Sequence, residues 1–424
     1  MTGRLTNWAG NITYDAARIH RPGSVEQLRK LVAKSDGIGA LGTRHSFNEI
    51  ADRPGGDLVS LEDLRGQAEL DPARRTVTVG AGVRYGELSR WLHGEGYALH
   101  NLGSLPHISV AGACATATHG SGTGNGNLAT AVSGLELVTA DGEIVVLSRE
   151  RDGDSFAGAV VGLGALGIVT RVTLDVVPTF DVRQYVYENL PWAQLEEHFE
   201  EIMSAAYSVS LFTGWSGPRI DQVWVKQRVD EPGRWEAAPR WLDATAAPAD
   251  RHPLPGLSAV NCTAQMGVPG PWYDRLPHFR LDFTPSSGEE LQSEYLLPRR
   301  HAISALRALD QVRDTVAPVL QVSEIRAVAA DDLWMSTSYG EDVIAFHFTW
   351  KKDWPAVRRV LAVVEEALEP FEARPHWGKL FVMSPQRVRS LYGRLPDFQR
   401  LLTDYDPTGK FRNAFVDDHL FGER

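Results

Sequence analysis

The spacing of apolar residues in the N-terminal part of the chain predicts short strands mixed with few helices. Residues 16–40 read as a turn, an amphipathic helix and a strand, and Ser24 with Gln27 can form a capping box at the start of that helix. A second strand over residues 76–79 leads into a helix over residues 85–92. This mixture favours an α+β arrangement over a doubly wound parallel sheet.

Two glycine-containing turns lie between the predicted elements of the N-terminal part of the chain. Alternating apolar runs on either side of Asp141-Gly142 predict a hairpin over residues 135–147. Residues 162–167 satisfy the GxGxxG pattern of nicotinamide dehydrogenases, but residues 168–174 alternate and are β-branched. They predict a strand where a dinucleotide-binding unit requires a helix, so we interpret the glycines as a tight loop.

The pattern changes after Pro178, where the spacings lengthen and aromatic clusters begin, so we place a domain boundary there. Residues 232–255 are rich in Pro, Trp and Ala and predict an extended surface loop. Helical periodicity returns over residues 301–316 and 355–368, with a strand-like run over residues 343–350 between them. These elements predict a second α+β domain.

Size and charge narrow the classes of function. A chain of 424 residues is too long for one ordinary hydrophobic core, which supports two domains. The net charge of −11 repels polyanions, so we expect neither nucleic acid nor a membrane surface as a partner. The longest apolar run, residues 157–169, is too short to cross a bilayer.

Cysteine usage and the N-terminus bear on the compartment. The two cysteines are too few for a disulfide framework, and no secretory pattern opens the chain, so we expect a cytoplasmic protein. No metal site is expected. The sequence leaves the oligomeric state open and is compatible with a monomer.

Two segments of the first domain carry the small residues that let backbone amides approach a diphosphate. They span residues 42–48 and 104–126. Glycine removes the steric barrier of a Cβ, and successive amides can then form an anion-binding concavity. Composition alone leaves a cofactor cradle and ordinary surface loops equally open.

Three short motifs of the second domain combine polar and apolar positions. Glu324 and Arg326 occupy alternate positions of one predicted strand, and His347 and Thr349 do so in another. Period-two alternation places each pair on one face of its strand, which is either solvated or lines a pocket for a hydroxyl-rich ligand. Lys379 ends the segment His376-Trp377-Gly378-Lys379 and could be a surface charge or part of that pocket.

Four segments of the first domain together match a flavoprotein pattern: Thr43-Arg44-His45-Ser46, residues 105–112, residues 118–122 and residues 165–170. They resemble the PCMH-type FAD-binding domain of the vanillyl-alcohol oxidase family, which implies a two-domain α+β fold of that type and FAD as cofactor. In that family the histidine of the first loop is commonly bonded to the flavin 8α-methyl group, so the resemblance implies His45 as the covalent attachment point. The FAD-binding residues that it implies are Gly42, Thr43, Arg44, His45, Ser46, Phe47, Ser104, Ser109, Gly112, Thr116, Ala117, Thr118, His119 and Val169.

The three polar motifs of the second domain are similar to the sugar-alcohol and aldonolactone oxidase branch of that family, and more closely to its alditol oxidases. This resemblance implies an FAD-binding domain over residues 1–178, a substrate domain over residues 179–385, and a segment over residues 386–424 that returns towards the FAD domain. It implies oxidation of a terminal hydroxyl of polyols such as xylitol or sorbitol, with O2 reduced to hydrogen peroxide.

Roles for individual residues follow from that reaction. Hydride removal from an alcohol requires the hydroxyl proton to be lost or stabilised, so we expect Lys379, Arg326, His347 and Glu324 to be catalytic. The expected substrate-binding residues are Ser104, Glu324, Arg326, Thr349 and Lys379. Gly103 lacks a side chain beside Ser104 and is expected to leave room for oxygen.

Three other functions remain open at this stage. An aldonolactone oxidase or dehydrogenase shares both domains and differs in the substrate that fits the pocket. A non-catalytic sugar-binding protein could use the same polar strands but would be colourless. A nicotinamide dehydrogenase is disfavoured by the strand predicted after Gly167.

Overall fold

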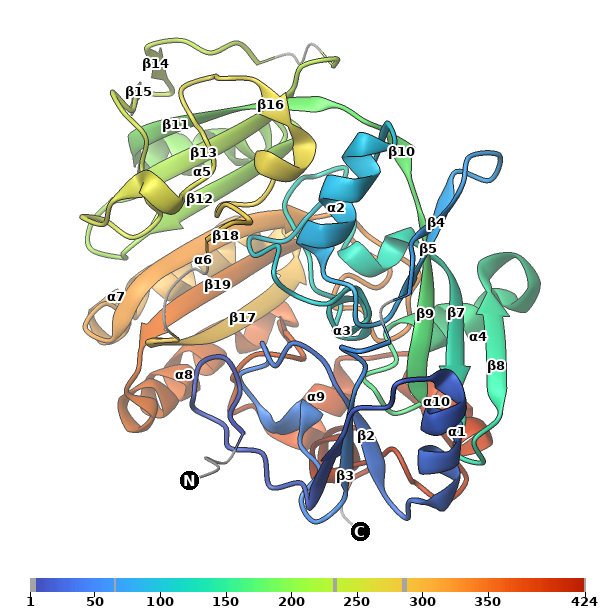
Figure 1. The fold of residues 1–424 in the computed structure, drawn as a ribbon. Coiled ribbons are helices and arrows are strands. Elements are labelled where there is room, and N and C mark those ends of the chain that lie inside the picture. The colour runs from blue at the N-terminus through green and yellow to red at the C-terminus, as the bar shows by residue number, and fades with distance from the viewer. Residues whose placement is uncertain (1–4, 65, 232–234, 284–287, 423–424) are drawn as a thin grey trace.

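The computed structural model describes residues 5–64, 66–231, 235–283 and 288–422 (Figure 1). The chain forms an α+β fold in which two large sheets lie beside one another. A five-stranded sheet belongs to the first domain, and a ten-stranded sheet belongs to the second. The last strand of the first sheet and the first strand of the second are separated by a few residues around Pro178.

The first domain contains three sheets. The antiparallel five-stranded sheet has the order β4-β5-β9-β7-β8, a parallel three-stranded sheet has the order β1-β3-β2, and β6 pairs with β10. Their bounds are β1 Arg18–His20, β2 Ile38–Leu41, β3 Asp57–Ser60, β4 Glu69–Asp71, β5 Thr76–Gly80, β6 Tyr97–Ala98, β7 Val132–Val138, β8 Ile144–Ser148, β9 Ile168–Asp175 and β10 Val177–Pro178. The helices of this domain are α1 Val25–Lys34, α2 Tyr85–Gly94, α3 Val110–Ala115 and α4 Arg149–Val160.

Local sequence signals of the first domain are confirmed. Ser24 caps α1 by accepting a hydrogen bond from the backbone N–H of Gln27, and Leu28 and Val32 are buried on its inner face. The strands β7 and β8 form the expected hairpin around Asp141-Gly142. The GxGxxG segment ends at Gly167 and runs directly into strand β9, not into a helix.

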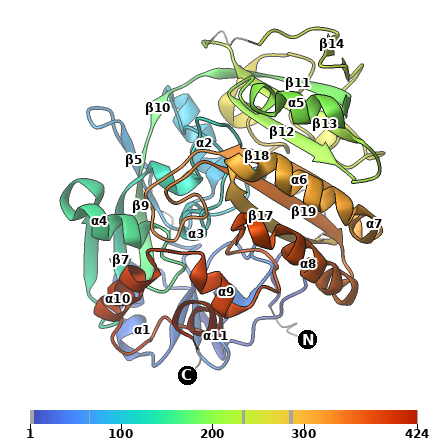
Figure 2. The same cartoon turned by 180° about the vertical axis from the view of Figure 1, so that it is seen from behind.

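The ten-stranded sheet of the second domain has the order β14-β15-β11-β13-β12-β18-β19-β17-β20, and β16 pairs with β11. Its strands are β11 Asp181–Pro191, β12 Ser208–Thr213, β13 Arg219–Arg228, β14 Arg240–Trp241, β15 Ala244–Ala246, β16 Gly270–Pro271, β17 Glu290–Pro298, β18 Leu320–Val328, β19 Val343–Lys351 and β20 Arg374–Pro375. The helices α5 Trp192–Met203, α6 Ala302–Gln311, α7 Arg313–Val316 and α8 Trp354–Leu368 cover one face of this sheet (Figure 2). The opposite face is turned towards the first domain.

Two expectations for the second domain are corrected. The helix expected over residues 301–316 is interrupted at Val312, which leaves the helical conformation between α6 and α7. Of the stretch over residues 232–255, residues 232–234 lie outside the described part of the chain. Residues 235–255 are not only a surface loop, because β14 and β15 within them join the edge of the sheet. Trp235 is 7% exposed and packs edge-on against Tyr187, so burial of aromatic rings holds this stretch against the sheet.

The chain after residue 385 packs against the first domain. It contains α9 Pro385–Ser390, α10 Leu395–Tyr405 and α11 Ala414–Val416 (Figure 2). Lys410 Nζ donates to the carbonyl oxygens of Val32 at 2.9 Å and Ala140 at 2.6 Å, and Asn413 Nδ2 donates to that of Ile50 at 3.0 Å. The second domain is thus followed by a segment that braces the N-terminal sheet.

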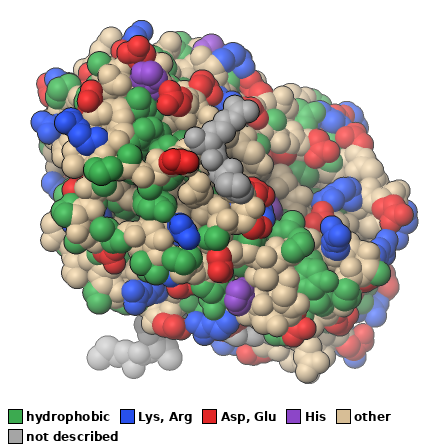
Figure 3. Space-filling model, turned by 90° about the horizontal axis from the view of Figure 1, so that it is seen from above, with side chains coloured by type: hydrophobic (Ala, Val, Ile, Leu, Met, Phe, Trp, Pro, Cys, Tyr) green, Lys and Arg blue, Asp and Glu red, His purple; other side chains and the backbone are tan. Residues whose placement is uncertain are grey.

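The outer surface mixes charges of both signs. Figure 3 shows acidic and basic side chains interspersed with apolar ones over the face seen from above. Within the described part of the chain, none of the helices is both long and apolar enough to cross a bilayer.

Candidate active site

A cavity of about 780 Å³ lies between the inner face of the ten-stranded sheet and the loops of the first domain. Both sets of predicted site residues line it. From the first domain these are Gly42, Thr43, Arg44, His45, Ser46, Phe47, Gly103, Ser104, Ser109, Gly112, Thr116, Thr118, His119 and Val169, and from the second Glu324, Arg326, His347, Thr349 and Lys379. Residues far apart in the sequence therefore form one site.

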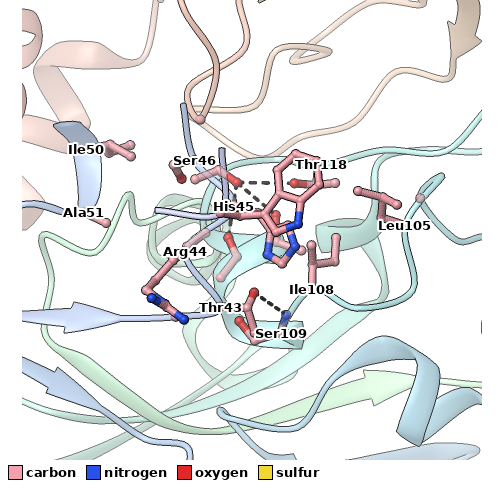
Figure 4. A pocket seen from close by; sticks show the side chains of 18 of the residues that line it. Thr43, Arg44, His45, Ser46, Ile50, Ala51, Leu105, Ile108, Ser109 and Thr118 are labelled. Atoms are coloured by element: carbon pink, nitrogen blue, oxygen red, sulfur yellow. Dashed lines mark hydrogen bonds between the residues drawn. The ribbon is translucent and has the colours of Figure 1, made fainter. Parts of the chain in front are cut away.

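The first wall of the cavity begins with the loop after β2. Figure 4 shows Thr43, His45 and Ser46 of this loop facing Ile108, Ser109 and Thr118 of the second glycine-rich segment. Thr43 Oγ1 accepts a hydrogen bond from the backbone N–H of Ser109 at 3.2 Å, which ties the two segments together.

Arg44 fixes the turn in this loop. It adopts a left-handed backbone with φ of 64°, a strained conformation for a residue other than glycine. Two contacts hold it: its guanidinium donates to the carbonyl oxygen of Thr6 at 2.9 Å, and its own carbonyl oxygen accepts from the N–H of Trp8 at 2.8 Å. The N-terminal residues thereby set the direction in which His45 points.

His45 is a neutral imidazole with one nitrogen unused. Its ring stacks on Trp8 at a centroid distance of 5.7 Å, and its buried Nδ1 has no hydrogen-bond partner. Burial, together with His107 and Arg84, lowers the pKa of His45 to about 4. An imidazole without a proton on one nitrogen is the nucleophilic form of the side chain.

The second glycine-rich segment supplies a close backbone surface around α3. A Cβ added at Gly112 would lie 2.8 Å from Ser109 Oγ, so this position has no room for a side chain without a shift. Ala117 is the one predicted cofactor residue that does not line the cavity. Its left-handed backbone, with φ of 53°, turns the methyl group into the apolar core, where it is fully buried.

The GxGxxG loop is also part of this wall. Gly162, Gly164 and Gly167 line the cavity, and a Cβ at Gly167 would lie 2.6 Å from the carbonyl oxygen of Val138. Gly167 thus allows close packing of the loop on β7. Small residues, backbone amides and an unpartnered histidine around an elongated cavity fit an FAD molecule.

The second wall consists of polar side chains on one face of three neighbouring strands. His347 on β19 lies directly opposite Glu324 on β18 and Glu294 on β17. Because side chains alternate along a strand, these three and their neighbours two positions away project from the same face. All three are buried, so this face lines a pocket and is not solvated.

Glu294 lies at the centre of this wall, and sequence reasoning missed it. Its carboxylate accepts from Lys379 Nζ at 2.6 Å and from Arg326 Nη2 at 3.0 Å, and it lies 3.3 Å from His119 Nε2. Burial alone would raise the pKa of Glu294, but Lys379, His119 and Arg326 outweigh burial and hold it well below its usual range. Glu294 is therefore an ionised carboxylate that holds two cations together.

His347 and Lys379 form the next contact of the wall. Lys379 Nζ lies 2.9 Å from His347 Nδ1, and His347 Nε2 lies 3.1 Å from Thr349 Oγ1. An ammonium group can only donate, so Nδ1 is the acceptor and the ring proton resides on Nε2. Burial and the neighbouring Lys379 lower the pKa of His347 to about 3, and burial also lowers the pKa of Lys379.

Arg326 links this wall to the first domain. Its Nη1 donates to Ser104 Oγ at 3.3 Å, and its Nε lies 3.5 Å from Glu324 Oε1. Glu324 Oε1 also accepts from His278 Nε2 at 2.8 Å. Burial opposes ionisation of Glu324, but Arg326 and His278 hold its pKa well below its usual range.

The missed residues differ in how well the sequence could have signalled them. Gln292 and Glu294 occupy alternate positions of β17 and both line the cavity, but the polar Ser293 between them breaks the polar–apolar alternation that identified Glu324 and Arg326. His278 lies outside the strands, where no periodicity marks its direction. His376 also lines the cavity, and its Nδ1 accepts from the N–H of Gly378 at 3.1 Å.

Comparisons with known proteins agree with this geometry. Residues 16–148 match the FAD binding domain family, and residues 288–419 match the D-arabinono-1,4-lactone oxidase family. The chain is 53% identical to an alditol oxidase of Streptomyces sp. over the full length of both proteins. It belongs to the alditol oxidase family.

More distant relatives of this alditol oxidase family member share the architecture. An L-gulono-1,4-lactone dehydrogenase of Mycobacterium tuberculosis is 28% identical over 97% of each chain. The crystal structure of cholesterol oxidase from Brevibacterium sterolicum superposes with a TM-score of 0.79 at 15% identity, covering 98% of this chain and 96% of that one. The superposition with cholesterol oxidase shows a shared two-domain fold. These findings confirm the predicted FAD-binding oxidoreductase and agree with the rejection of a nicotinamide dehydrogenase.

Proposed function

We propose that this protein oxidises a terminal hydroxyl of alditols such as xylitol and sorbitol to the aldose, and that O2 is reduced to hydrogen peroxide. The observation that carries the proposal is the single cavity in which a wall of backbone amides and glycines faces a buried network of carboxylates and cations. When bound, FAD supplies the acceptor for the hydride at its N5 atom. The 53% identity to an alditol oxidase supports the choice of substrate.

The substrate binds to the polar wall. Ser104, Glu324, Arg326, Thr349 and Lys379 all border the cavity, and together they offer both donors and acceptors to vicinal hydroxyls. A substrate that lacks one hydroxyl leaves a buried polar group without a partner, which costs about 1–3 kcal/mol. The pocket therefore prefers polyols to simple alcohols.

Lys379 and Arg326 stabilise the oxygen from which the proton leaves. Glu294 holds both cations in place, so their charge is directed at the cavity before the substrate arrives. Glu294 is a positioning residue in this scheme, because it acts through the two cations.

His347 relays the proton. When Lys379 Nζ turns from His347 Nδ1 to the substrate oxygen, Nδ1 takes the hydroxyl proton. In the same step the proton on Nε2 passes to Thr349 Oγ1, and the Thr349 hydroxyl gives up its own proton to water. The pKa of about 3 for His347 makes it a poor resting base and favours this relay.

His45 is proposed as the covalent attachment point of FAD. Its support is the neutral ring, the unpartnered Nδ1 and its place in the wall of the cavity. Gly103 is proposed as the position that admits oxygen. A Cβ built there would have its nearest neighbour, the carbonyl oxygen of His119, at 3.7 Å, so a methyl group would fit in ordinary van der Waals contact and a larger side chain would take up space beside Ser104.

The cytoplasm is proposed as the compartment. Cys114 and Cys262 are both buried and form no disulfide with one another. Two cysteines that form no disulfide with one another are compatible with a reducing environment.

An aldonolactone oxidase or dehydrogenase is the second candidate, favoured by the D-arabinono-1,4-lactone oxidase match over residues 288–419. The deciding experiment offers xylitol, sorbitol and L-gulono-1,4-lactone to the purified protein and records peroxide, oxygen uptake and the visible spectrum. We expect a yellow protein that forms one peroxide per alditol consumed. Turnover of the lactone alone would support the second candidate, and a colourless protein would defeat both.

Acid precipitation tests the covalent bond separately. Flavin that stays with the pellet indicates attachment to the chain. Flavin that is released entirely into the supernatant would contradict the role of His45 and leave the alditol assay unaffected.

A further inference from the structure

Another buried cation, Lys226, lies behind the polar wall and is not used in the steps proposed above. Lys226 is on β13, and its side chain is 1% exposed. Strand pairing places it on the inner face: Ser208 of β12 lies opposite Lys226, and two positions along β12 Ser210 lies opposite Arg326 of β18. Lys226 therefore belongs to the same surface as Glu324 and Arg326 but sits deeper.

Lys226 uses its three donors on three acceptors of one loop. Its Nζ contacts the carbonyl oxygen of Leu276, lies 3.3 Å from that of Pro277 and lies 3.2 Å from Nδ1 of His278. An ammonium group has no acceptor, so in this arrangement His278 Nδ1 accepts and the ring proton is on Nε2. Burial lowers the pKa of Lys226 to about 7, and the charge of Glu324 opposes that shift.

His278 connects Lys226 to Glu324, which lines the cavity. Its Nε2 lies 2.8 Å from Glu324 Oε1, and its ring is held edge-on by Phe212 at 5.5 Å and Trp224 at 5.1 Å. The ring is 5% exposed, so water does not replace these contacts. The described hydrogen bonds and ion pairs of Glu324 all fall on Oε1, and Glu324 lines the cavity.

We infer that Lys226 and His278 are positioning residues for alditol oxidation: Lys226 fixes the Nε2–H tautomer of His278, and His278 occupies Oε1 of Glu324 so that Oε2 is presented to a substrate hydroxyl. The inference rests on the proposed function, because it assigns the substrate to the pocket that Glu324 borders. The chain Lys226–His278–Glu324 acts on substrate binding and orientation, and neither Lys226 nor His278 touches the reacting atoms.

The competing explanation is a structural brace. Lys226 contacts two carbonyl oxygens as well as His278, so it could serve only to hold residues 276–278 in place. A brace predicts that every change at His278 costs stability alike. A positioning chain predicts that a residue able to donate to Glu324 restores function.

The experiment compares His278→Phe with His278→Gln in the FAD-loaded protein, with Glu324→Gln alone and combined with His278→Phe. Phenylalanine keeps the ring between Phe212 and Trp224 but cannot donate, whereas the glutamine amide can donate to Glu324 Oε1. Anaerobic mixing with xylitol, followed at the flavin absorbance, separates the apparent Kd from the limiting rate. The melting temperature and the visible spectrum report folding.

We expect His278→Phe to raise the apparent Kd for xylitol about 10- to 100-fold, the effect of losing one hydrogen bond to a charged group, with a smaller change in the limiting rate. His278→Gln should recover most of that loss. In the Glu324→Gln background, His278→Phe should change Kd less than 3-fold, because the group it positions has lost its charge. Equal losses in His278→Phe and His278→Gln, or additive losses in the double variant, would overturn the inference.

A measurement without turnover separates this inference from the proposed function. Nitrogen NMR of the His278 ring, assigned by its absence in His278→Gln, should show the Nε2–H tautomer in the unaltered protein. A mixture of tautomers should appear when Lys226→Met is combined with Glu324→Gln, because the Glu324 carboxylate also favours a proton on Nε2, whereas a glutamine amide can donate or accept. A ring protonated on Nδ1 would contradict the chain even if alditols are oxidised. An expected tautomer with no turnover of any alditol would instead reject the proposed substrate.

Discussion

The two walls of the cavity differ in the chemical groups that form them. The wall of the first domain is rich in backbone, glycine and small side chains, and its His45 ring is neutral. The wall of the second domain consists of buried charges in contact, with Glu294 joined to Lys379 and Arg326. The first wall suits an elongated cofactor that is held by many weak contacts, and the second suits a small substrate held by few strong ones.

This difference predicts unequal sensitivity to substitution. On the first wall, a larger side chain should weaken FAD binding by steric overlap. Loss of a side chain there should weaken FAD binding little, because the backbone contacts remain. On the second wall, the loss of one charge leaves its partner buried and unpaired, which is the more costly event. The variants below, ordered from the largest expected effect to the smallest, test that contrast.

Lys379→Met should lower kcat with xylitol about 10³-fold or more, because it removes the ammonium group that stabilises the substrate oxygen as its hydroxyl proton leaves. The visible spectrum of bound FAD should be retained, since Lys379 belongs to the opposite wall. Steady-state oxygen uptake measures the first effect and absorbance the second. Lys34→Met, at the exposed end of α1, is the matched control. Unaltered turnover in Lys379→Met would remove Lys379 from the mechanism.

Glu294→Gln should lower kcat about 10²-fold, as removing the anion leaves Lys379 and Arg326 to repel each other across the pocket. Both kcat and the pH dependence of turnover should shift, because the pKa of Lys379 falls further once its counter-charge is gone. Glu366→Gln on the exposed side of α8 is the control. A variant with a normal pH profile would show that Glu294 does not position the cations.

His45→Ala should release all flavin into the supernatant after acid precipitation, while the folded protein still binds FAD through the backbone of the first wall. We expect kcat to fall by about 10-fold, because the bond orients the cofactor but does not create its site. If folded His45→Ala bound no FAD, the contrast between the two walls would be wrong, because one side chain would then contribute more to FAD binding than the backbone contacts.

Gly103→Leu should slow reoxidation by O2 about 10-fold and leave reduction by xylitol nearly unchanged. Gly103→Ala should be close to the unaltered protein, because the nearest atoms to its Cβ lie at 3.7 to 4.0 Å. Stopped-flow mixing of the reduced protein with O2 gives the rate. If both variants consume oxygen at the normal rate, Gly103 is not the route of oxygen.

Acidification from about pH 6.5 to 4 should reduce the free energy of unfolding. The folded pKa values of His278 and His347 lie near 4 and 3, below the ordinary value of 6.5, so the unfolded chain binds more protons in this window. Each group then contributes stability above pH 6.5 that is lost as the pH falls towards its folded pKa. His278→Phe should flatten the profile measured by urea unfolding, and an unaltered slope would show that His278 is protonated in the folded state.

The sequence by itself determined the local elements and most of the site. Capping at Ser24, the Asp141-Gly142 turn and the alternation after Gly167 each act within a few residues, so they specify α1, the β7–β8 hairpin and β9 without tertiary help. Period-two spacing likewise gave the direction of Glu324, Arg326, His347 and Thr349.

Only the tertiary structure decided which of these groups meet. Glu294, Lys379 and His119 come from β17, the segment after β20 and a loop of the first domain, and no spacing along the chain relates them. The contact of His278 with Glu324 depends on a loop folded over the sheet. Local periodicity fixes which way a side chain points, whereas the packing of two domains fixes what it faces and how far its pKa shifts.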